Sequence, residues 1–217
     1  MNQRFIVFDM DGTLTDTLPV MVEAMQRALE QCGFPRHAEP VRVREELGVD
    51  LALTVRTLLP FAEAADHKRV TSTYAALYRD VEQELGLRLF PEVMPTLKHL
   101  RDGGHKLVIG TGKSRAGLDR VLPLLGIGPW FADSCTADES AHKPDPLMLE
   151  LLLARNGVAR EDAVMIGDTT YDVEMARRAG VRSIAVSSGT HSAQALRAAG
   201  ANHLVATLLE VPELLSA

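Results

Sequence analysis

Short apolar segments recur along this chain, and each is followed by a turn and then by a helix-like stretch. The segments that share this pattern are residues 4–8, 106–109, 163–166 and 183–186, with a shorter candidate at 202–205. Between and after them, helical periodicity covers residues 94–100, 115–125, 146–156, 171–179 and 208–215. Strands that alternate with helices form βαβ units, in which right-handed crossovers join parallel strands. The order of these segments therefore predicts an α/β fold built on a Rossmann-like parallel sheet.

The stretch from residue 16 to residue 87 breaks this alternation, because it carries helical periodicity without a convincing strand. Apolar residues recur there at the spacing of an amphipathic helix over residues 20–31, 51–59 and 67–85. We therefore predict that the chain carries an inserted all-helical cap subdomain at residues 16–87. The α/β catalytic core would then consist of residues 1–15 and 88–217.

The overall charge offers no broad positive field, since the 217 residues carry a formal net charge of −6. This balance predicts neither a nucleic-acid nor a membrane partner, so an anionic ligand must be bound by a local site. Cys32 and Cys135 lack CxxC spacing, which argues against a disulfide framework or a structural zinc site. The N-terminal apolar run is too short for a signal peptide, and no stretch is long enough to cross a membrane. We expect a cytoplasmic protein.

Polar residues follow the predicted strands, at the sheet edge where ligands bind in open α/β sheets. The residues with this placement are Asp9, Asp11, Thr111, Gly112, Asp168 and Asp172, joined by Lys143 ahead of the helix near residue 146. Because the carboxyl ends of parallel strands meet at one edge, we expect several carboxylates, a hydroxyl group and a lysine to gather there.

Crowded carboxylates repel one another, and a hard divalent cation removes the conflict. Mg²⁺ prefers oxygen ligands and is commonly held by one or two carboxylates together with a substrate phosphate. Asp9 and Asp168 suit that role, whereas Asp172 either binds the metal directly or orients the residues that do. The same Asp172 could instead serve only the first turn of a helix, where an acid is favoured.

The remaining groups suit phosphoryl transfer. Asp9, at the rigid end of the first strand, is a candidate nucleophile that forms an aspartyl-phosphate. Asp11, in the following turn, can protonate the leaving alcohol and then accept a proton from water. Thr111, the N–H groups near Gly112 and Lys143 suit the binding of phosphate oxygens. Taken alone, Lys143 would usually be a solvated surface lysine and Thr111 an ordinary turn residue.

Four ordered motifs resemble those of the haloacid dehalogenase superfamily. Asp9-Met10-Asp11-Gly12-Thr13 resembles the first, Thr111 the second, Lys143-Pro144 the third, and residues 167–172 (GDTTYD) the fourth. The resemblance covers nearly the whole chain and implies a helical cap between the first two motifs. It also implies that the Asp11 backbone carbonyl joins Asp9 and Asp168 as a metal ligand.

Asp11 also distinguishes branches of that superfamily. The dehalogenases lack this second aspartate and the phosphonate-cleaving branch has a small residue there, so its presence implies phosphoryl transfer. The nearest match is the phosphoglycolate phosphatase-like group. We therefore expect a Mg²⁺-dependent phosphatase acting on a small phosphorylated metabolite, as a monomer or homodimer.

Two alternatives remain open at this point. A phosphosugar mutase of the same superfamily would share the first chemical step but return the phosphoryl group to a sugar hydroxyl. A phospho-receiver or binding protein also sets acids, a hydroxyl group and a lysine on a parallel sheet, although it needs no helical cap.

Other basic and histidine residues have weaker claims. Residues 110–114 read GTGKS, the tail of a P-loop, but Leu107 stands where that loop needs a glycine. We therefore expect Lys113 in solvent or at the edge of the site. Cap residues Arg42, Arg44 and Arg56 are candidates for a substrate anion, although basic residues on helices usually form a solvated face. His142 and His191 are left outside the catalytic set.

Overall fold

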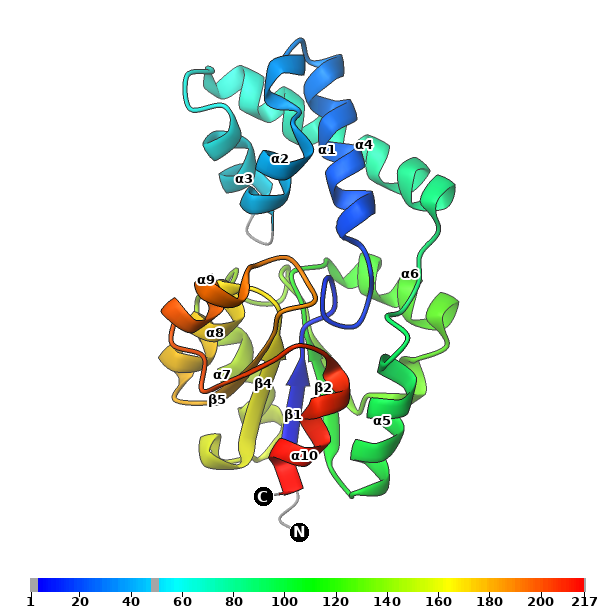
Figure 1. Ribbon diagram of the computed structural model, residues 1–217, viewed down its shortest axis with the longest axis vertical. Helices are drawn as coiled ribbons and strands as arrows, with labels where there is room; N and C mark the ends of the chain where they lie inside the picture. The colour runs from blue at the N-terminus through cyan, green and yellow to red at the C-terminus, as the bar shows by residue number, and fades with distance from the viewer. Residues whose placement is uncertain (1–3, 48–50, 217) are drawn as a thin grey trace. The chain divides into compact units, whose positions relative to one another are not determined.

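A computed structural model describes residues 4–47 and 51–216, and the chain divides into two compact units (Figure 1). One unit consists of Met1–Asp16 and Leu89–Ala217, and the other of Thr17–Arg88. The chain therefore leaves the first unit after its first strand, forms the whole of the second unit, and then returns to complete the first.

The first unit contains a six-stranded sheet in which every described strand pair is parallel. Its strands are β1 (Phe5–Phe8), β2 (Lys106–Gly110), β3 (Asp133–Cys135), β4 (Ala163–Gly167), β5 (Arg182–Val186) and β6 (His203–Val205). The order across the sheet is β3-β2-β1-β4-β5-β6, so the winding reverses at β1. A ligand site in such a sheet is expected beyond the carboxyl ends of the strands at this reversal.

Helices connect the strands of this unit. They are α5 (Val93–Asp102), α6 (Arg115–Leu125), α7 (Leu147–Asn156), α8 (Thr170–Ala179), α9 (Ala193–Ala198) and α10 (Val211–Ser216), with short 3₁₀ turns η2 (Gly128–Trp130), η3 (Arg160–Asp162) and η4 (Leu208–Glu210). The side chains of β1 alternate between two buried faces. Val7 packs with Val108, Met165 and residues of α7 and α8, whereas Phe8 meets Phe131 edge-on at 6.2 Å between ring centroids.

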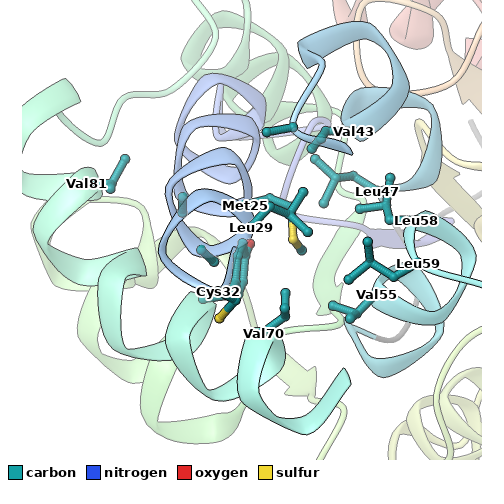
Figure 2. Close-up of a cluster of buried hydrophobic side chains, with 14 of the residues drawn as sticks. Met25, Leu29, Cys32, Val43, Leu47, Val55, Leu58, Leu59, Val70 and Val81 are labelled. Carbon is teal, nitrogen blue, oxygen red and sulfur yellow. The ribbon is translucent and has the colours of Figure 1, made fainter. Parts of the chain in front are cut away.

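The second unit is a helical bundle around its own core (Figure 2). Its helices are α1 (Leu18–Gln31), α2 (Pro40–Glu46), α3 (Leu51–Leu58) and α4 (Ala64–Leu85), with the 3₁₀ turn η1 (Pro35–His37) between α1 and α2. Met25 and Leu29 of α1 pack with Val43, Leu58 and Val70 from the other helices. Among its described residues this unit contains no strand.

The predicted α/β fold with an inserted helical region is confirmed, and the predicted strands lie within one residue of β1, β2, β4, β5 and β6. Three elements were not predicted: β3, α2 and α9. The edge strand β3 is only Asp-Ser-Cys, and α2 and α9 span seven and six residues, so none carries a full apolar pattern. Within the described ranges, no helix combines the length and apolar character needed to cross a membrane.

Candidate active site

The carboxyl ends of β1 and β4 place two aspartates side by side at the centre of the sheet. Asp9 follows β1, and its backbone N–H donates to the Ile166 carbonyl at 2.8 Å, which extends the strand pairing beyond β1. Asp168 follows β4 in the same way. Both residues are buried, with 6% and 0% of their surface exposed. The strands thus hold two carboxylates at the point where the winding of the sheet reverses.

Asp172, in the first turn of α8, completes a group of three buried acids. One carboxylate oxygen from each of Asp9, Asp168 and Asp172 lies within 4.8 Å of the others. An all-oxygen set of this kind matches the ligand preference of a hard divalent cation, so the cluster is a candidate metal site.

Lys143 provides the positive charge within this group. Its Nζ lies 2.5 Å from Asp9 Oδ1 and 2.7 Å from Asp172 Oδ1, and its side chain is 9% exposed. The loop between β3 and α7 carries Lys143, which stands 134 residues from Asp9 along the chain. The fold therefore brings the lysine of the third motif onto the first aspartate of the first.

Burial and mutual repulsion shift the proton affinities of the cluster. Burial raises the pKa of Asp9 well above its usual range; Lys143 opposes this, and the charges of Asp172 and Asp168 add to it. Burial, followed by the Asp172 charge, raises the pKa of Asp168 to about 6. Burial alone would lower the pKa of Lys143, but the carboxylates of Asp172 and Asp9 raise it above its usual value. When all three carboxylates of the cluster are ionised, their negative charge exceeds the single positive charge of Lys143.

The two oxygens of Asp168 are held by groups from two other loops. Thr13 Oγ1 donates to Oδ1 at 2.8 Å, and the Thr190 N–H donates to Oδ2 at 2.7 Å. Two glycines allow the loops to come this close. A Cβ added at Gly12, where φ is +82°, or at Gly189 would lie 2.2 or 2.3 Å from Asp168 Oδ2. Any side chain at either position would displace the carboxylate.

The sequence patterns gave no role to Gly189 or Thr190, and none to Thr13 beyond its motif. Their common signal was position alone, because each lies just beyond a strand whose end faces the same edge. What each residue contacts becomes visible only once β1, β4 and β5 are paired.

Asp172 also stabilises the first turn of its own helix, α8. Its Oδ2 accepts from the Thr169 N–H at 3.1 Å and its own N–H donates to Thr169 Oγ1 at 3.3 Å, which forms a capping box at the start of α8; Oδ2 also accepts from Thr169 Oγ1 at 2.6 Å. Its Oδ1 accepts from Lys143. Through these bonds the Asp172 carboxylate orients both Lys143 and the start of α8.

Asp11 lies apart from the acid cluster, in the turn that follows β1. Its nearest charged partner is Lys113, whose Nζ lies 2.9 Å from Asp11 Oδ1 as an ion pair. Among the described residues, no donor reaches that buried oxygen with hydrogen-bond geometry. The side chains of Lys113 and Asp11 are 11% and 22% exposed. Lys113 was expected in solvent or at the edge of the site, and its ammonium group is directed at Asp11.

The loop after β2 contributes Thr111 and Gly112. Thr111 is fully buried, and its N–H donates to the Cys135 carbonyl at 3.0 Å. Its Oγ1 accepts from the Lys113 N–H at 3.1 Å, which tightens the turn. Gly112 is exposed, and a Cβ there would meet no atom within 4 Å. The space beside Gly112 is therefore open to a ligand.

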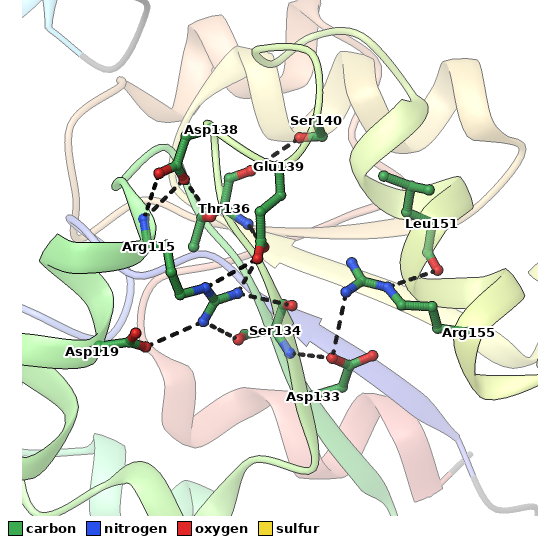
Figure 3. A network of polar contacts seen from close by, with 10 residues as sticks. All are labelled: Arg115, Asp119, Asp133, Ser134, Thr136, Asp138, Glu139, Ser140, Leu151 and Arg155. Atoms are coloured by element: carbon green, nitrogen blue, oxygen red, sulfur yellow. Dashed lines mark hydrogen bonds and ion pairs between the residues drawn. The ribbon is translucent and has the colours of Figure 1, made fainter.

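A network around Arg115 ties this loop to the segment that leads to Lys143 (Figure 3). The guanidinium group donates to Glu139 at 3.1 and 2.7 Å and to the Ser134 hydroxyl at 2.9 Å. The Arg115 N–H donates to Asp138 at 2.8 Å, so the start of α6 and the loop after β3 are joined. The sequence did not indicate this network, since Asp138 and Glu139 stand 23 and 24 residues from Arg115 and carry no motif.

Two groups of residues with weaker claims have structural partners. His191 Nδ1 accepts from the Thr170 N–H at 3.0 Å and its ring lies 5.6 Å from that of Tyr171, so it supports the start of α8. In the helical unit, Arg42 donates to the Leu58 carbonyl at 3.1 Å and Arg56 is exposed.

Comparisons with known proteins agree with this geometry. Residues 6–186 match the family model described as haloacid dehalogenase-like hydrolase. The chain is 34% identical over 212 residues to "Probable phosphatase IndB" of Dickeya dadantii, an alignment covering 95% of this chain and 90% of that one. It is 33% identical over 216 residues to "Phosphoglycolate phosphatase, plasmid" of Cupriavidus necator, covering 97% and 92%.

Solved structures share the fold. A crystal structure from Lactobacillus delbrueckii subsp. bulgaricus, described as a phosphoglycolate phosphatase, aligns with a TM-score of 0.88 at 25% identity. The alignment covers 99% of this chain and 98% of that one, so the likeness extends over both units.

Proposed function

Because the chain belongs to the haloacid dehalogenase-like hydrolase family, we propose that it is a Mg²⁺-dependent phosphatase that hydrolyses a small phosphomonoester through an aspartyl-phosphate. Phosphatase chemistry as a class follows from the family and from its phosphatase relatives. One observation carries the finer proposal: Lys143 pairs with Asp9 beside two further buried carboxylates, at the reversal point of the sheet.

Asp9 is the proposed nucleophile. Its carboxylate attacks phosphorus, an oxygen–phosphorus bond forms, and the bond to the leaving alcohol breaks. The contact with Lys143 and the backbone bond to Ile166 hold Asp9 in one position, which favours in-line attack. Burial raises the pKa of Asp9 and Lys143 opposes this, and a bound cation would likewise favour the charged carboxylate that attacks phosphorus.

Asp11 is the proposed acid and base. In the first step it gives a proton to the leaving alcohol, and in the second it takes a proton from the water that attacks the aspartyl-phosphate. Its place in the turn supports this role, because it lies beyond the nucleophile and outside the acid cluster. The two aspartates of the first motif thus do different work.

Lys143, Thr111 and the Gly112 N–H are the proposed holders of the phosphate oxygens. Lys143 already meets the nucleophile, and Gly112 borders open space at the end of β2. Stabilising the charge on these oxygens is expected to be the largest contribution to catalysis.

Asp9 and Asp168 are the proposed side-chain ligands of Mg²⁺, and the Asp11 backbone carbonyl is the ligand that the family implies. The donor set fits, since it consists of oxygens alone and repulsion among the carboxylates calls for a cation. When bound, the metal supplies charge neutralisation to the phosphate and the nucleophile. Asp172 is assigned to orienting Lys143, because its Oδ1 accepts from that lysine and its Oδ2 accepts from Thr169 at the start of α8.

We assign residues 1–15 and 88–217 to the catalytic core and residues 16–87 to the cap, in agreement to within one or two residues with the two compact units. The substrate class follows the relatives: a phosphorylated small acid of the phosphoglycolate kind. Two free cysteines suit a cytoplasmic enzyme, which we propose acts as a monomer or homodimer.

The test is release of free phosphate from a panel of phosphate esters in Mg²⁺, by the wild-type chain and by Asp9→Asn. We expect turnover of small esters by the wild type and loss of about a thousandfold or more in the variant. Asp102→Asn, at an exposed ion pair on α5, is the matched control and should retain activity. Retained turnover in Asp9→Asn would refute the mechanism, and an isomerised sugar phosphate in place of free phosphate would identify a mutase.

A further inference from the structure

Lys113 is fixed in position by its own backbone. Its N–H donates to Thr111 Oγ1 at 3.1 Å, and its carbonyl accepts from the Ala137 N–H at 3.0 Å. The side chain is 11% exposed and ends 2.9 Å from Asp11 Oδ1. A lysine on a flexible surface loop would be mobile and solvated, whereas this ammonium group is largely buried and ion-paired with the Asp11 carboxylate.

This position lies on the leaving-group side of the site. Under the proposed function, on which this inference rests, Asp11 contacts the ester oxygen that departs. Whatever part of the substrate follows that oxygen therefore begins beside Asp11, and so beside Lys113. Lys143, by contrast, is bound to Asp9 and Asp172 on the side of the nucleophile.

The negative charge that Asp11 gains as it gives up its proton limits which leaving groups can depart beside it. A carboxylate on the carbon next to the ester oxygen would be repelled by the Asp11 carboxylate at short range and with little water to screen it. A cation placed between the two negative charges removes this penalty. An ammonium group carries three donors, so it can contact Asp11 and a second carboxylate together.

We infer that Lys113 is a specificity-determining residue that binds the carboxylate of a 2-phosphorylated hydroxy acid beside Asp11. The site thereby selects an ester whose leaving group is anionic over an otherwise equal neutral one. Arg115, the next cation along the chain, does not suit this role, because its guanidinium group is engaged by Glu139, Ser134 and Asp119.

The experiment compares 2-phosphoglycolate with its carboxyl methyl ester, which keeps the phosphate but replaces the carboxylate of the leaving group by an uncharged methyl ester. The kcat/KM for each is measured with saturating Mg²⁺ for the wild type, Lys113→Met, Lys113→Arg and Lys98→Met. The quantity of interest is the preference, which is the ratio of the two kcat/KM values. Lys98 lies on exposed α5 in an ion pair with Asp102, so Lys98→Met makes the same chemical change away from the site.

We expect the wild type to prefer the anionic ester and Lys113→Met to lose that preference by about tenfold to a hundredfold, the effect of one charge-assisted hydrogen bond. Lys113→Arg should keep most of the preference, and Lys98→Met all of it. Turnover of the methyl ester by each variant shows in the same sample that the protein is folded.

Two results would overturn the inference while leaving the phosphatase intact: equal loss on both esters in Lys113→Met, or no loss on either. A neutral substitution that retains the preference would mean that another group binds the carboxylate. Failure of the wild type to release phosphate from any ester would instead overturn the proposed function, and this inference with it.

Discussion

Asp9 and Asp11 stand two residues apart in the chain, yet they lie in contrasting environments. Asp9 belongs to a buried cluster with two other acids and a lysine that is 9% exposed. Asp11 belongs to a looser pair with Lys113 at the edge of the same site. The first environment fixes groups that must not move during the reaction. The second leaves an oxygen without a hydrogen-bond donor among the described residues, as suits a group that must gain and lose a proton.

The largest expected difference between the two regions is therefore the change in stability when the lysine of each, Lys143 or Lys113, is replaced. Lys143→Met leaves Asp9 and Asp172 buried without their cation, whereas Lys113→Met leaves a partly exposed Asp11. Because an uncompensated buried charge is costly, we expect Lys143→Met to lower the free energy of unfolding by about 3–5 kcal/mol at pH 7.5. Urea denaturation followed by circular dichroism measures this, in the absence of Mg²⁺.

The comparison fails if both variants are destabilised equally. Lys113→Met is expected to be less destabilised than Lys143→Met, because the Asp11 side chain is 22% exposed and water can reach it, whereas those of Asp9 and Asp172 are 8% and 2% exposed. At pH 5 the loss in Lys143→Met should shrink, because Asp9, whose pKa is already raised in the wild type, can then take up a proton. Lys98→Met is the control for removal of an exposed lysine.

The buried region was also the more predictable from sequence. Asp9 and Asp168 follow apolar strands, so the parallel sheet dictates that their ends meet at one edge. Lys143 was found through its motif and not through any periodicity. The helical unit was predicted because its helices α1, α3 and α4 carry long apolar patterns, and α2 was not, because its seven residues do not.

The looser region was harder to predict, for a physical reason. The contact between Lys113 and Asp11 depends on where the lysine side chain points. In a loop, neither the residue type nor its spacing from other residues predicts that direction. The same holds for Arg115, whose acids come from a different loop, and for Thr190, whose backbone N–H holds Asp168. Contacts made by loop backbone and by long side chains depend on tertiary distances that a sequence pattern does not contain.

The next largest effect is expected at Gly189, which tests how tightly the buried cluster is built. A Cβ at this position would lie 2.3 Å from Asp168 Oδ2 and 2.4 Å from the Gly12 carbonyl oxygen, so Gly189→Ala must displace one of them. We expect loss of Mg²⁺ binding by isothermal titration calorimetry and a fall of about 1–3 kcal/mol in the free energy of unfolding.

Gly128→Ala is the matched control for that change. Its Cβ would meet only Leu122 Cβ at 3.7 Å, which is an ordinary contact. Mg²⁺ binding by Gly189→Ala with unchanged affinity would show that the loop after β5 can retreat, and that Asp168 is less tightly held than its contacts with Thr13 and Thr190 indicate.

The smallest expected effect is a shift of a few degrees in Tm. Its dependence on pH distinguishes the buried acid cluster, which contains Asp168, from the environment of Asp11. The pKa of Asp168 is about 6 in the folded protein against an ordinary value of 3.8, so the folded state binds more protons than the unfolded state between these values. Metal-free protein should therefore lose this contribution to stability as the pH rises from about 4 to about 6. Bound Mg²⁺ compensates the ionised cluster, so the rise in Tm that Mg²⁺ produces should be larger at pH 7.5 than at pH 5.

Substitutions at the two aspartates assign this pH dependence. Asp11→Asn keeps the backbone carbonyl and all three clustered carboxylates, and should retain the difference between the two pH values while losing turnover. Asp168→Asn removes one of the two clustered carboxylates whose pKa is raised, and a proposed ligand of Mg²⁺ with it, so it should reduce the difference, as measured by differential scanning calorimetry with and without Mg²⁺. If Asp11→Asn abolished the difference as well, the two aspartates would belong to one coupled site, and the division between a fixed cluster and a looser acid–base edge would be wrong.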